Sequence, residues 1–317
     1  MLAVVSLGGC STSSHPAPSG GQTPSKEPTA PVVSLPTPTV SQRQEAPLPE
    51  AREEAAAATL DHDLYVLGGF DPSGNDTSTV FISDGKSWRR GPSLPIAVDH
   101  PAAAVVSRRL VVAGGFHGGS ASAQVFVLSP GGLAWESAPP MRRARGALAL
   151  VGVETRLYAI GGRSALGEVA VAEAYEASSG AWTDLPPLPQ PRDHLAGFAD
   201  SLRPCVAGGV SPGTPRVDCW DAATAAWRRL PDLPAAPRGA GGASLGSVDV
   251  VAGGEDGAET RLVDLVMRRR DAGWTTEEML SPRHGFELAA LSGRLWACGG
   301  GAEPGLHPSN ICTSIAP

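Results

Sequence analysis

Basic side chains are scarce in this sequence, and lysine is almost missing. Lysine and arginine together number 25 against 32 acidic residues, the formal net charge is −7, and Lys26 and Lys86 are the two lysines. A nucleic-acid partner needs a basic surface that neutralises phosphates, so this balance argues against one. The preference for arginine suits bidentate carboxylate binding, but GC-rich codon usage would produce the same bias.

The motifs of several common enzyme sites are missing too. The sequence has no Walker loop, no zinc-ligand spacing and no Ser/His/Asp order, so we predict no metal, no cofactor and no catalytic residue from it. The apolar run Met1–Cys10 is too short to cross a bilayer. It matches the end of a secretory signal instead.

The first forty residues are not expected to join a folded domain. Leu7-Gly8-Gly9-Cys10 resembles a bacterial lipobox, which implies a lipid on Cys10. No Lys or Arg precedes the run, so either the signal starts upstream or the match is accidental. Residues 11–40 are rich in Ser, Pro and Thr, bury too little apolar surface to offset the entropy of ordering, and are predicted to form a tether or a disordered tail. We therefore expect an extracytoplasmic protein, lipid-anchored at the cell envelope or secreted.

Six Gly-Gly pairs recur along the rest of the chain. Their first glycines are 46, 47, 47, 45 and 46 residues apart (Gly68, Gly114, Gly161, Gly208, Gly253 and Gly299). Five tryptophans recur at a similar interval after the first five pairs (Trp88, Trp135, Trp182, Trp227 and Trp274). An apolar residue stands six positions beyond each tryptophan (Leu94, Met141, Leu188, Leu233 and Leu280). These interlocked spacings indicate a structural repeat.

Each repeat has the pattern of four short strands. An Ala/Val-rich run such as Ala102–Val106 is followed by a run ending in Gly-Gly, an alternating strand and a Trp strand ending in Leu-Pro, with no helical period between them. The pattern predicts an all-β fold: a six-bladed β-propeller over residues 41–317, built of four-stranded antiparallel blades. The glycines suit a turn with positive φ, and the tryptophans are expected to fill the core between adjacent sheets.

Several segments of these repeats resemble the kelch repeat. Tyr65–Gly69 and Tyr158–Gly162 match its aromatic–apolar–apolar–Gly-Gly strand, and Trp182–Pro189 matches its Trp strand and exit turn. The resemblance covers residues 42–317 and implies a propeller like the central domain of galactose oxidase. Kelch propellers include binding proteins, epimerases and copper oxidases, so the fold leaves the function open. The three tyrosines stand at core strand positions, which argues against a copper–radical site.

The ends of the chain are predicted to share one blade. No Trp strand follows the sixth Gly-Gly, whereas residues 41–52 align with the Trp strand of the first repeat and place Gln42 or one of its neighbours where Trp would stand. The N-terminal strand would then complete the last blade and remove the open edges. Two cysteine pairs, each 14 residues apart, place one cysteine on a Gly-Gly strand and one on the next (Cys205 and Cys219, Cys298 and Cys312). We expect two within-blade disulfides, with buried free thiols as the alternative.

Arginine recurs sixteen residues before the first glycine of most pairs. The position holds Arg52, Arg145, Arg192 and Arg283, Arg238 stands one residue off, and His100, His194 and His284 lie beside it. The kelch resemblance places this position at one mouth of the central channel, on the face that carries the loops after Gly-Gly. Such a ring would attract carboxylate or phosphate groups. Alternatively, the arginines bind backbone carbonyls of the neighbouring blade and are structural.

The leading hypothesis for function is a non-catalytic binding protein. It would be a monomer that presents one loop-lined face to an unidentified glycan, peptide or protein ligand, including anionic ones. The alternative is a carbohydrate-active enzyme that resembles a sialic-acid mutarotase or epimerase. In that case Glu54, Asp99 and Asp193, which lie beside the ring positions, would supply the acid or base.

Overall fold

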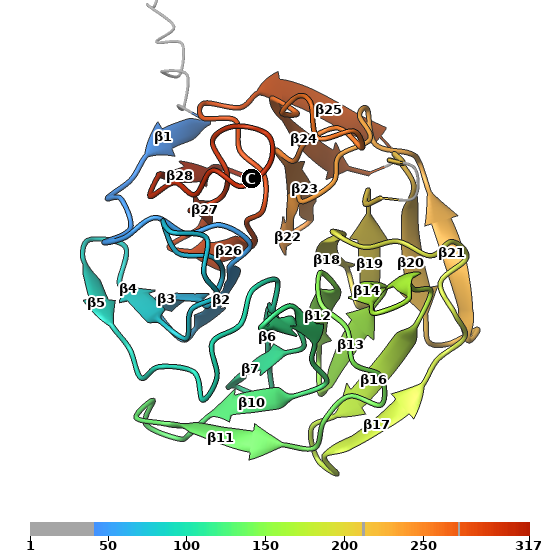
Figure 1. Cartoon of the computed structure of the whole chain (residues 1–317). Coiled ribbons are helices and arrows are strands. Elements are labelled where there is room, and N and C mark those ends of the chain that lie inside the picture. Colours follow the sequence, from blue (N-terminus) through green and yellow to red (C-terminus); the bar gives the residue numbers. More distant parts are fainter. Residues whose placement is uncertain (1–40, 211–212, 272) are drawn as a thin grey trace, which may run out of the picture. The chain divides into compact units, whose positions relative to one another are not determined.

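Six four-stranded antiparallel sheets stand around a central channel (Figure 1) in the computed structural model of the chain. The structure describes residues 41–210, 213–271 and 273–317. The predicted all-β, six-bladed propeller is confirmed. The predicted lipid site at Cys10 and the predicted tether over residues 11–40 lie outside the described residues. Within the described ranges, no helix is long and apolar enough to span a membrane.

Each blade is built outward from the channel. The inner strands are β2 (Ala56–Leu60), β6 (Ala102–Val106), β12 (Ala149–Val153), β18 (Ala196–Asp200), β22 (Gly241–Leu245) and β26 (Leu288–Leu291). The second strands, which lead into Gly-Gly, are β3 (Asp63–Leu67), β7 (Arg109–Ala113), β13 (Arg156–Ile160), β19 (Arg203–Ala207), β23 (Val248–Ala252) and β27 (Arg294–Cys298). The third strands are β4 (Val80–Ser83), β10 (Val125–Leu128), β16 (Ala172–Glu176), β20 (Val217–Asp221), β24 (Leu265–Arg270) and β28 (Cys312–Ile315).

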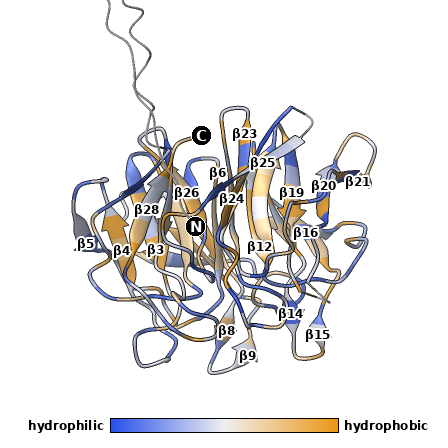
Figure 2. Cartoon of the chain, turned by 90° about the horizontal axis from the view of Figure 1, so that it is seen from above, coloured by the Kyte–Doolittle hydropathy of each residue, from blue (hydrophilic) through white to orange (hydrophobic). Residues whose placement is uncertain are grey.

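The outer strands and two small hairpins complete the ring. The outer strands are β5 (Trp88–Arg90), β11 (Trp135–Ala138), β17 (Ala181–Asp184), β21 (Ala226–Leu230), β25 (Gly273–Glu278) and, for the last blade, β1 (Gln42–Gln44). Hairpins β8 (Phe116–His117) with β9 (Ser120–Ala121) and β14 (Arg163–Ser164) with β15 (Gly167–Glu168) extend two of the loops that follow Gly-Gly. We call the face that carries these six loops the loop face. Figure 2 shows both hairpins projecting from it.

The core lies between neighbouring blades. Each apolar cluster draws on two adjacent sheets; for example, Val111 of the second blade and Leu150 of the third share one cluster. Because both faces of the second and third strands are covered, strands such as β7 and β10 are continuous apolar runs rather than alternating ones. A blade alone would leave both faces in water, so the closed ring is the stable unit.

The ring closes where the two ends of the chain meet, as predicted. β1 pairs with β28 antiparallel, with Gln42 opposite Ile315. The side-chain amide of Gln42 donates to the Glu278 carbonyl at 2.7 Å. The indole N–H groups make the same bond to the preceding blade, as Trp182 does to the Pro139 carbonyl at 2.9 Å. Gln42 therefore replaces a tryptophan in position and in hydrogen bonding.

Two details of the repeat differ from expectation. Only Trp182 is fully buried, while the other four repeat tryptophans lie half-buried at the outer edge between blades, because the outer strands face solvent. In the fifth repeat Met279, not Leu280, takes the buried position: Met279 is 3% exposed and Leu280 is 52% exposed. The N–H of Met279 donates to the Asp264 carbonyl as the N–H of Leu94 does to Ser78, so the backbone register selects the residue.

The two predicted disulfides are present within blades. Cys205 lies opposite Cys219 across β19 and β20, and Cys298 lies opposite Cys312 across β27 and β28. The bridge between Cys298 and Cys312 ties the third strand of the blade that β1 completes. In the chain-entropy description, closing a loop of this length stabilises the fold by about 3 kcal/mol.

The Gly-Gly pairs tie each blade to the next. The N–H of the second glycine donates to a carbonyl at the start of the next blade, as Gly69 does to Val98 at 2.9 Å and Gly300 does to Arg52 at 2.7 Å across the closure. The first glycine has φ of 64° at Gly68, and a Cβ there would lie 2.6 Å from the Val98 carbonyl oxygen. Both positive φ and close approach therefore require glycine.

Candidate site at the channel mouth

A closed ring of backbone hydrogen bonds surrounds the channel at the loop face. Six residues, one from each blade, have φ between 47° and 63° (Glu54, His100, Ala147, His194, Gly239 and Gly285). The N–H of each donates to the carbonyl of the equivalent residue in the preceding blade, at 2.7 to 3.1 Å. We call these six residues the amide ring. Because the ring closes on itself, its hydrogen bonds hold each residue in the left-handed conformation, which residues with side chains rarely adopt.

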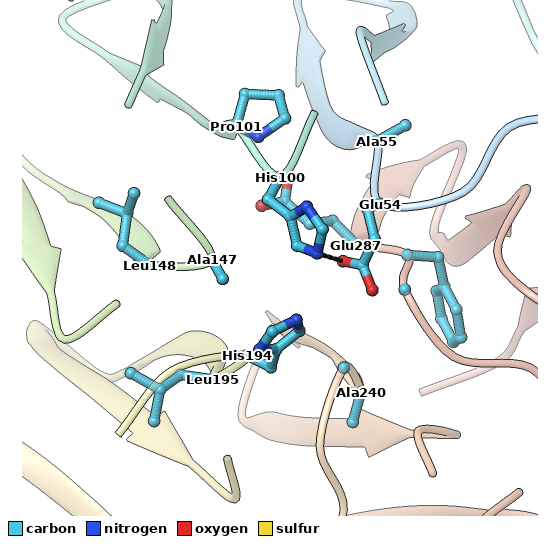
Figure 3. A pocket seen from close by; sticks show the side chains of 13 residues that line it. Glu54, Ala55, His100, Pro101, Ala147, Leu148, His194, Leu195, Ala240 and Glu287 are labelled. Carbon is cyan, nitrogen blue, oxygen red and sulfur yellow. Dashed lines mark ion pairs between the residues drawn. The ribbon is translucent and has the colours of Figure 1, made fainter. Parts of the chain in front are cut away.

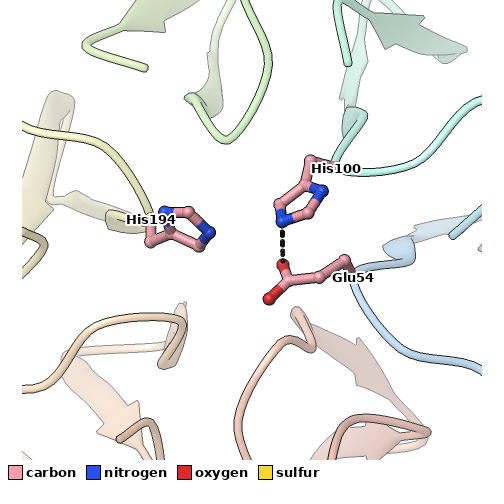
Figure 4. Close-up of side chains that lie close together, drawn as sticks. All are labelled: Glu54, His100 and His194. Carbon is pink, nitrogen blue, oxygen red and sulfur yellow. Dashed lines mark ion pairs between the residues drawn. The ribbon is translucent and has the colours of Figure 1, made fainter. Parts of the chain in front are cut away.

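Three side chains of the amide ring meet over the channel (Figure 4). Glu54, His100 and His194 come from the first, second and fourth blades. His100 Nε2 is 3.5 Å from Glu54 Oε2. The two imidazole rings stand perpendicular with centroids 5.0 Å apart. Residues that are one to three repeats apart in the sequence thus share a single polar cluster.

An aspartate orients each of the two histidines. Asp99 Oδ1 is 2.5 Å from His100 Nδ1, and Asp193 Oδ1 is 2.9 Å from His194 Nδ1. Arg238 Nη2 lies 3.2 Å from His194 Nε2. Because a guanidinium can only donate, Nε2 of His194 accepts, and the proton of this imidazole is on Nδ1.

Charge in the cluster is balanced between acids and bases. Burial opposes the charged form of His100, but Glu54 and Asp99 outweigh it and raise the pKa of this imidazole. Burial likewise opposes ionisation of Glu54, but its basic neighbours, His100 first, outweigh burial and lower the pKa of this carboxyl. Both groups therefore favour their charged forms and attract each other.

His284 lies beneath the last loop and borders the cluster, with its Nδ1 4.0 Å from Glu54 Oε1. Its Nε2 is 3.5 Å from Glu53 Oε1, its Nδ1 is 3.7 Å from Glu255 Oε1, and its side chain is 4% exposed. Glu53 Oε2 accepts from the N–H of His307 at 2.7 Å. Burial, followed by repulsion from Glu54, raises the pKa of Glu53 to about 8. These groups hold the loop at residues 301–309 against the ring rather than opening to a ligand.

Four of the five predicted ring arginines do not reach the channel mouth. Arg52, Arg145, Arg192 and Arg283 are at most 1% exposed. Arg283 donates to five oxygens of its own blade, including the Gly299 and Ile311 carbonyls at 2.7 Å. Arg192 donates to the Gly208 carbonyl and pairs with Asp218 at 2.6 Å. As a correction to the predicted ring, these guanidiniums lie inside blades, and most of their carbonyl partners are in their own blade rather than the neighbouring one.

Arg238 is the predicted arginine that does reach the mouth. Its one-residue offset moves it from the buried arginine position to the next position, which holds Asp99 and Asp193 in other blades. The side chain extends over the cluster to His194, lies 3.6 Å from Glu255, and pairs with Glu259. An offset in the repeat thus converts a structural arginine into a site residue.

The channel beneath the cluster is narrow (Figure 3). Its cavity measures about 50 Å³ and is lined by the amide ring, by apolar side chains such as Leu148 and Phe286, and by Glu287. Glu287 Oε2 accepts from the N–H of Ala57 at 2.7 Å, and burial raises its pKa to about 8. The sequence reasoning missed Glu287. The signal was there, because the equivalent residue of the other repeats is Ala or Gly.

Six radial four-stranded sheets closed head to tail define a β-propeller. Three stretches match the kelch motif, at residues 51–95, 99–142 and 144–189. The chain is a six-bladed β-propeller that carries kelch motifs in its first three repeats.

Known proteins support this assignment. The chain is 28% identical over 298 residues to Kelch-like protein terF of Aspergillus terreus, covering 84% of this chain and 64% of that protein. It is 30% identical over 156 residues to Kelch repeat and BTB domain-containing protein 13 of Homo sapiens, covering 46% of this chain and 34% of that protein. The chain thus spans less than two thirds of these relatives. The solved structure of YjhT superposes with a TM-score of 0.73 at 14% identity, covering 86% of this chain and 97% of that one, which is a likeness of fold.

Proposed function

We propose that this kelch propeller is a non-catalytic binding protein that presents its loop face to a peptide or protein partner outside the cytoplasm. The observation that carries the proposal is the size of the channel. Its cavity at the loop face measures about 50 Å³, whereas sites that bury a small organic ligand measure about 300–1,000 Å³. A ligand would therefore lie across the loops rather than inside the channel.

The position of the chain ends supports the choice of face. The N–H of Ala316 donates to the Ser41 carbonyl at 2.6 Å, and the C-terminus lies at the face opposite hairpins β8–β9 and β14–β15 (Figure 2). Ser41, the first described residue, therefore lies on the side opposite the loop face, which leaves the loop face free of the chain ends. The two disulfides suit an oxidising compartment. We therefore place the protein outside the cytoplasm, with Cys10 as the proposed lipid anchor.

Exposed leucines lie on both faces of the ring. On the loop face, Leu166 at the tip of β14–β15 is 98% exposed, and Leu306 in the last loop is 46% exposed. On the opposite face, Leu133 in the β10–β11 turn is 83% exposed, and Leu202 in the β18–β19 turn is 64% exposed. Leu166 and Leu306 would supply apolar contact within the polar surroundings of the loop face.

A displayed peptide library and a glycan array probe the proposal. We expect peptides to be selected, and we expect Leu166→Asp combined with Leu306→Asp to weaken their binding at least tenfold. Leu133→Asp is the matched control and should bind as wild type does. Selected peptides whose binding survives the loop-face change but not the control change would refute the choice of face.

The enzyme alternative has its own observation and its own test. Glu54 faces His100 across the channel, which is an arrangement that could exchange protons with a sugar. NMR measures the rate at which the anomers of N-acetylneuraminic acid exchange. We expect the full chain to leave this rate unchanged. Acceleration that is lost in Glu54→Gln would overturn the binding-protein proposal in favour of a mutarotase.

A further inference from the structure

We propose that the channel mouth binds one divalent transition-metal ion through His100 Nε2, His194 Nε2 and the Glu54 carboxylate. One ligand atom from each residue lies within 4.8 Å of the other two. Two ligands that are each about 2 Å from a tetrahedral zinc ion stand roughly 3.3 Å apart. The 3.5 Å between His100 Nε2 and Glu54 Oε2 is close to that value. Binding would displace the proton between His100 Nε2 and Glu54, and His194 would have to turn its Nε2 from Arg238 toward the ion.

The surroundings of both histidines match those of metal ligands. A metal-bound imidazole usually donates its second N–H to a carboxylate, which fixes the tautomer and aims the free nitrogen at the ion. Asp99 and Asp193 occupy that place for His100 and His194. Each aspartate directly precedes its histidine and is held by a backbone bridge, Asp99 to Phe116 and Asp193 to Val210. In two different blades, an aspartate thus holds an imidazole that faces the channel.

The amide ring places these three side chains on the channel axis. Glu54, His100 and His194 have φ of 50°, 47° and 51°, and Ala147, which carries no ligand atom, has φ of 51°. The left-handed conformation is therefore a property of the ring. What makes the cluster a candidate for function is that three of the six ring positions carry polar side chains that converge on one point.

The donor set and the space select the class of ion. Two imidazoles with one carboxylate suit zinc, iron, cobalt or nickel in the divalent state, whereas calcium and magnesium prefer oxygen ligands. The cavity of about 50 Å³ holds an ion with one or two waters. All three ligands come from this chain, so the metal site does not depend on the proposed peptide or protein partner.

Arg238 competes with the ion for His194. Its Nη2 donates to His194 Nε2 at 3.2 Å, so binding requires this guanidinium to move aside toward Glu255 and Glu259. Removing the guanidinium would free Nε2 and remove a positive charge beside the ion. We therefore expect Arg238→Ala to bind the metal more tightly than wild type, an effect that a purely structural cluster would not produce.

Titration of the EDTA-treated full chain with CoCl2 and ZnCl2 tests the inference, by calorimetry and by the visible d–d absorption of cobalt. We expect one equivalent to bind, His100→Ala and His194→Ala each to weaken binding about 100-fold, and Asp193→Asn to weaken it about 10-fold. Thermal unfolding checks that each variant folds. If a histidine variant does not fold, Glu54→Gln replaces it as the variant that removes a ligand. His117→Ala is the control, because this rim histidine lies outside the cluster with a side chain 59% exposed. The proposal is overturned if wild type shows neither a heat of binding nor a cobalt d–d spectrum. It is also overturned if binding survives the loss of both histidines.

Discussion

Replacing Arg283 by alanine should destabilise the ring rather than change a binding surface. All five N–H groups of this guanidinium donate, to four backbone carbonyls and to the Thr313 hydroxyl, at 2.7 to 3.3 Å. The partners include Ile311 beside β28, the strand that receives β1, so the side chain holds the blade through which the ring closes. It also packs over the Phe286 ring at 5.4 Å.

The magnitude follows from two opposing terms. A hydrogen bond to a charged donor contributes about 1.5–3 kcal/mol, so five of them contribute roughly 10 kcal/mol. Burial lowers the pKa of Arg283 to about 10, and a fall of that size from the ordinary value corresponds to a cost of about 3 kcal/mol. Part of the remainder is recovered as water enters the gap. We expect a loss of about 4 kcal/mol, within the range for a broken buried charge site.

Urea unfolding followed by tryptophan fluorescence measures this loss. Arg283→Ala should also lower the thermal midpoint by roughly 10 °C. Arg283→Lys, with three donors, should fall between the variant and wild type. The control is Arg261→Ala at an exposed loop position, expected within about 0.5 kcal/mol of wild type. A variant that unfolds at the wild-type urea concentration but loses affinity for acidic ligands would refute the structural role and restore the anion-binding ring.

Three further outcomes follow from the same structure. Cys298→Ala with Cys312→Ala should lower the free energy of unfolding by about 3 kcal/mol, and reductant should change this double variant less than wild type. A chain beginning at Ala46 lacks β1, so it should expose the edge of β28 and form oligomers by gel filtration, whereas one beginning at Ser41 should not; equal elution of the two would count against shared closure. Glu287 keeps its proton in the folded state up to pH about 8 but loses it near its ordinary pKa when unfolded, so its contribution to stability falls as pH rises from about 4.5 to 8. Glu287→Gln should flatten that part of the pH–stability curve, by about 1–2 kcal/mol since the group retains some solvent access, and an unchanged curve would contradict the assignment.

The architecture was predictable because its determinants repeat at short range. Gly68 and its equivalents need positive φ and a close carbonyl wherever they occur, so six such pairs at a constant interval specify six sheets. The closure was predictable for the same reason, since Gln42 stands in the register of a tryptophan and makes its hydrogen bond. At one position a regular interval misled: Leu280 stands six residues after Trp274, as its equivalents do, but the backbone register buries Met279 instead.

The site depended on tertiary structure. The same spacing of arginines is compatible with a ring of exposed guanidiniums at the channel mouth and with guanidiniums buried inside the blades. The burial of Arg192 and Arg283 shows that the second arrangement is present. The convergence of Glu54, His100 and His194 cannot be read from spacing, because these residues come from separate blades and meet only when the ring closes. Local sequence therefore determined the number and kind of sheets, through turn geometry and strand patterning. Radial packing alone determined which side chains share the channel, because residues a repeat or more apart come together only there.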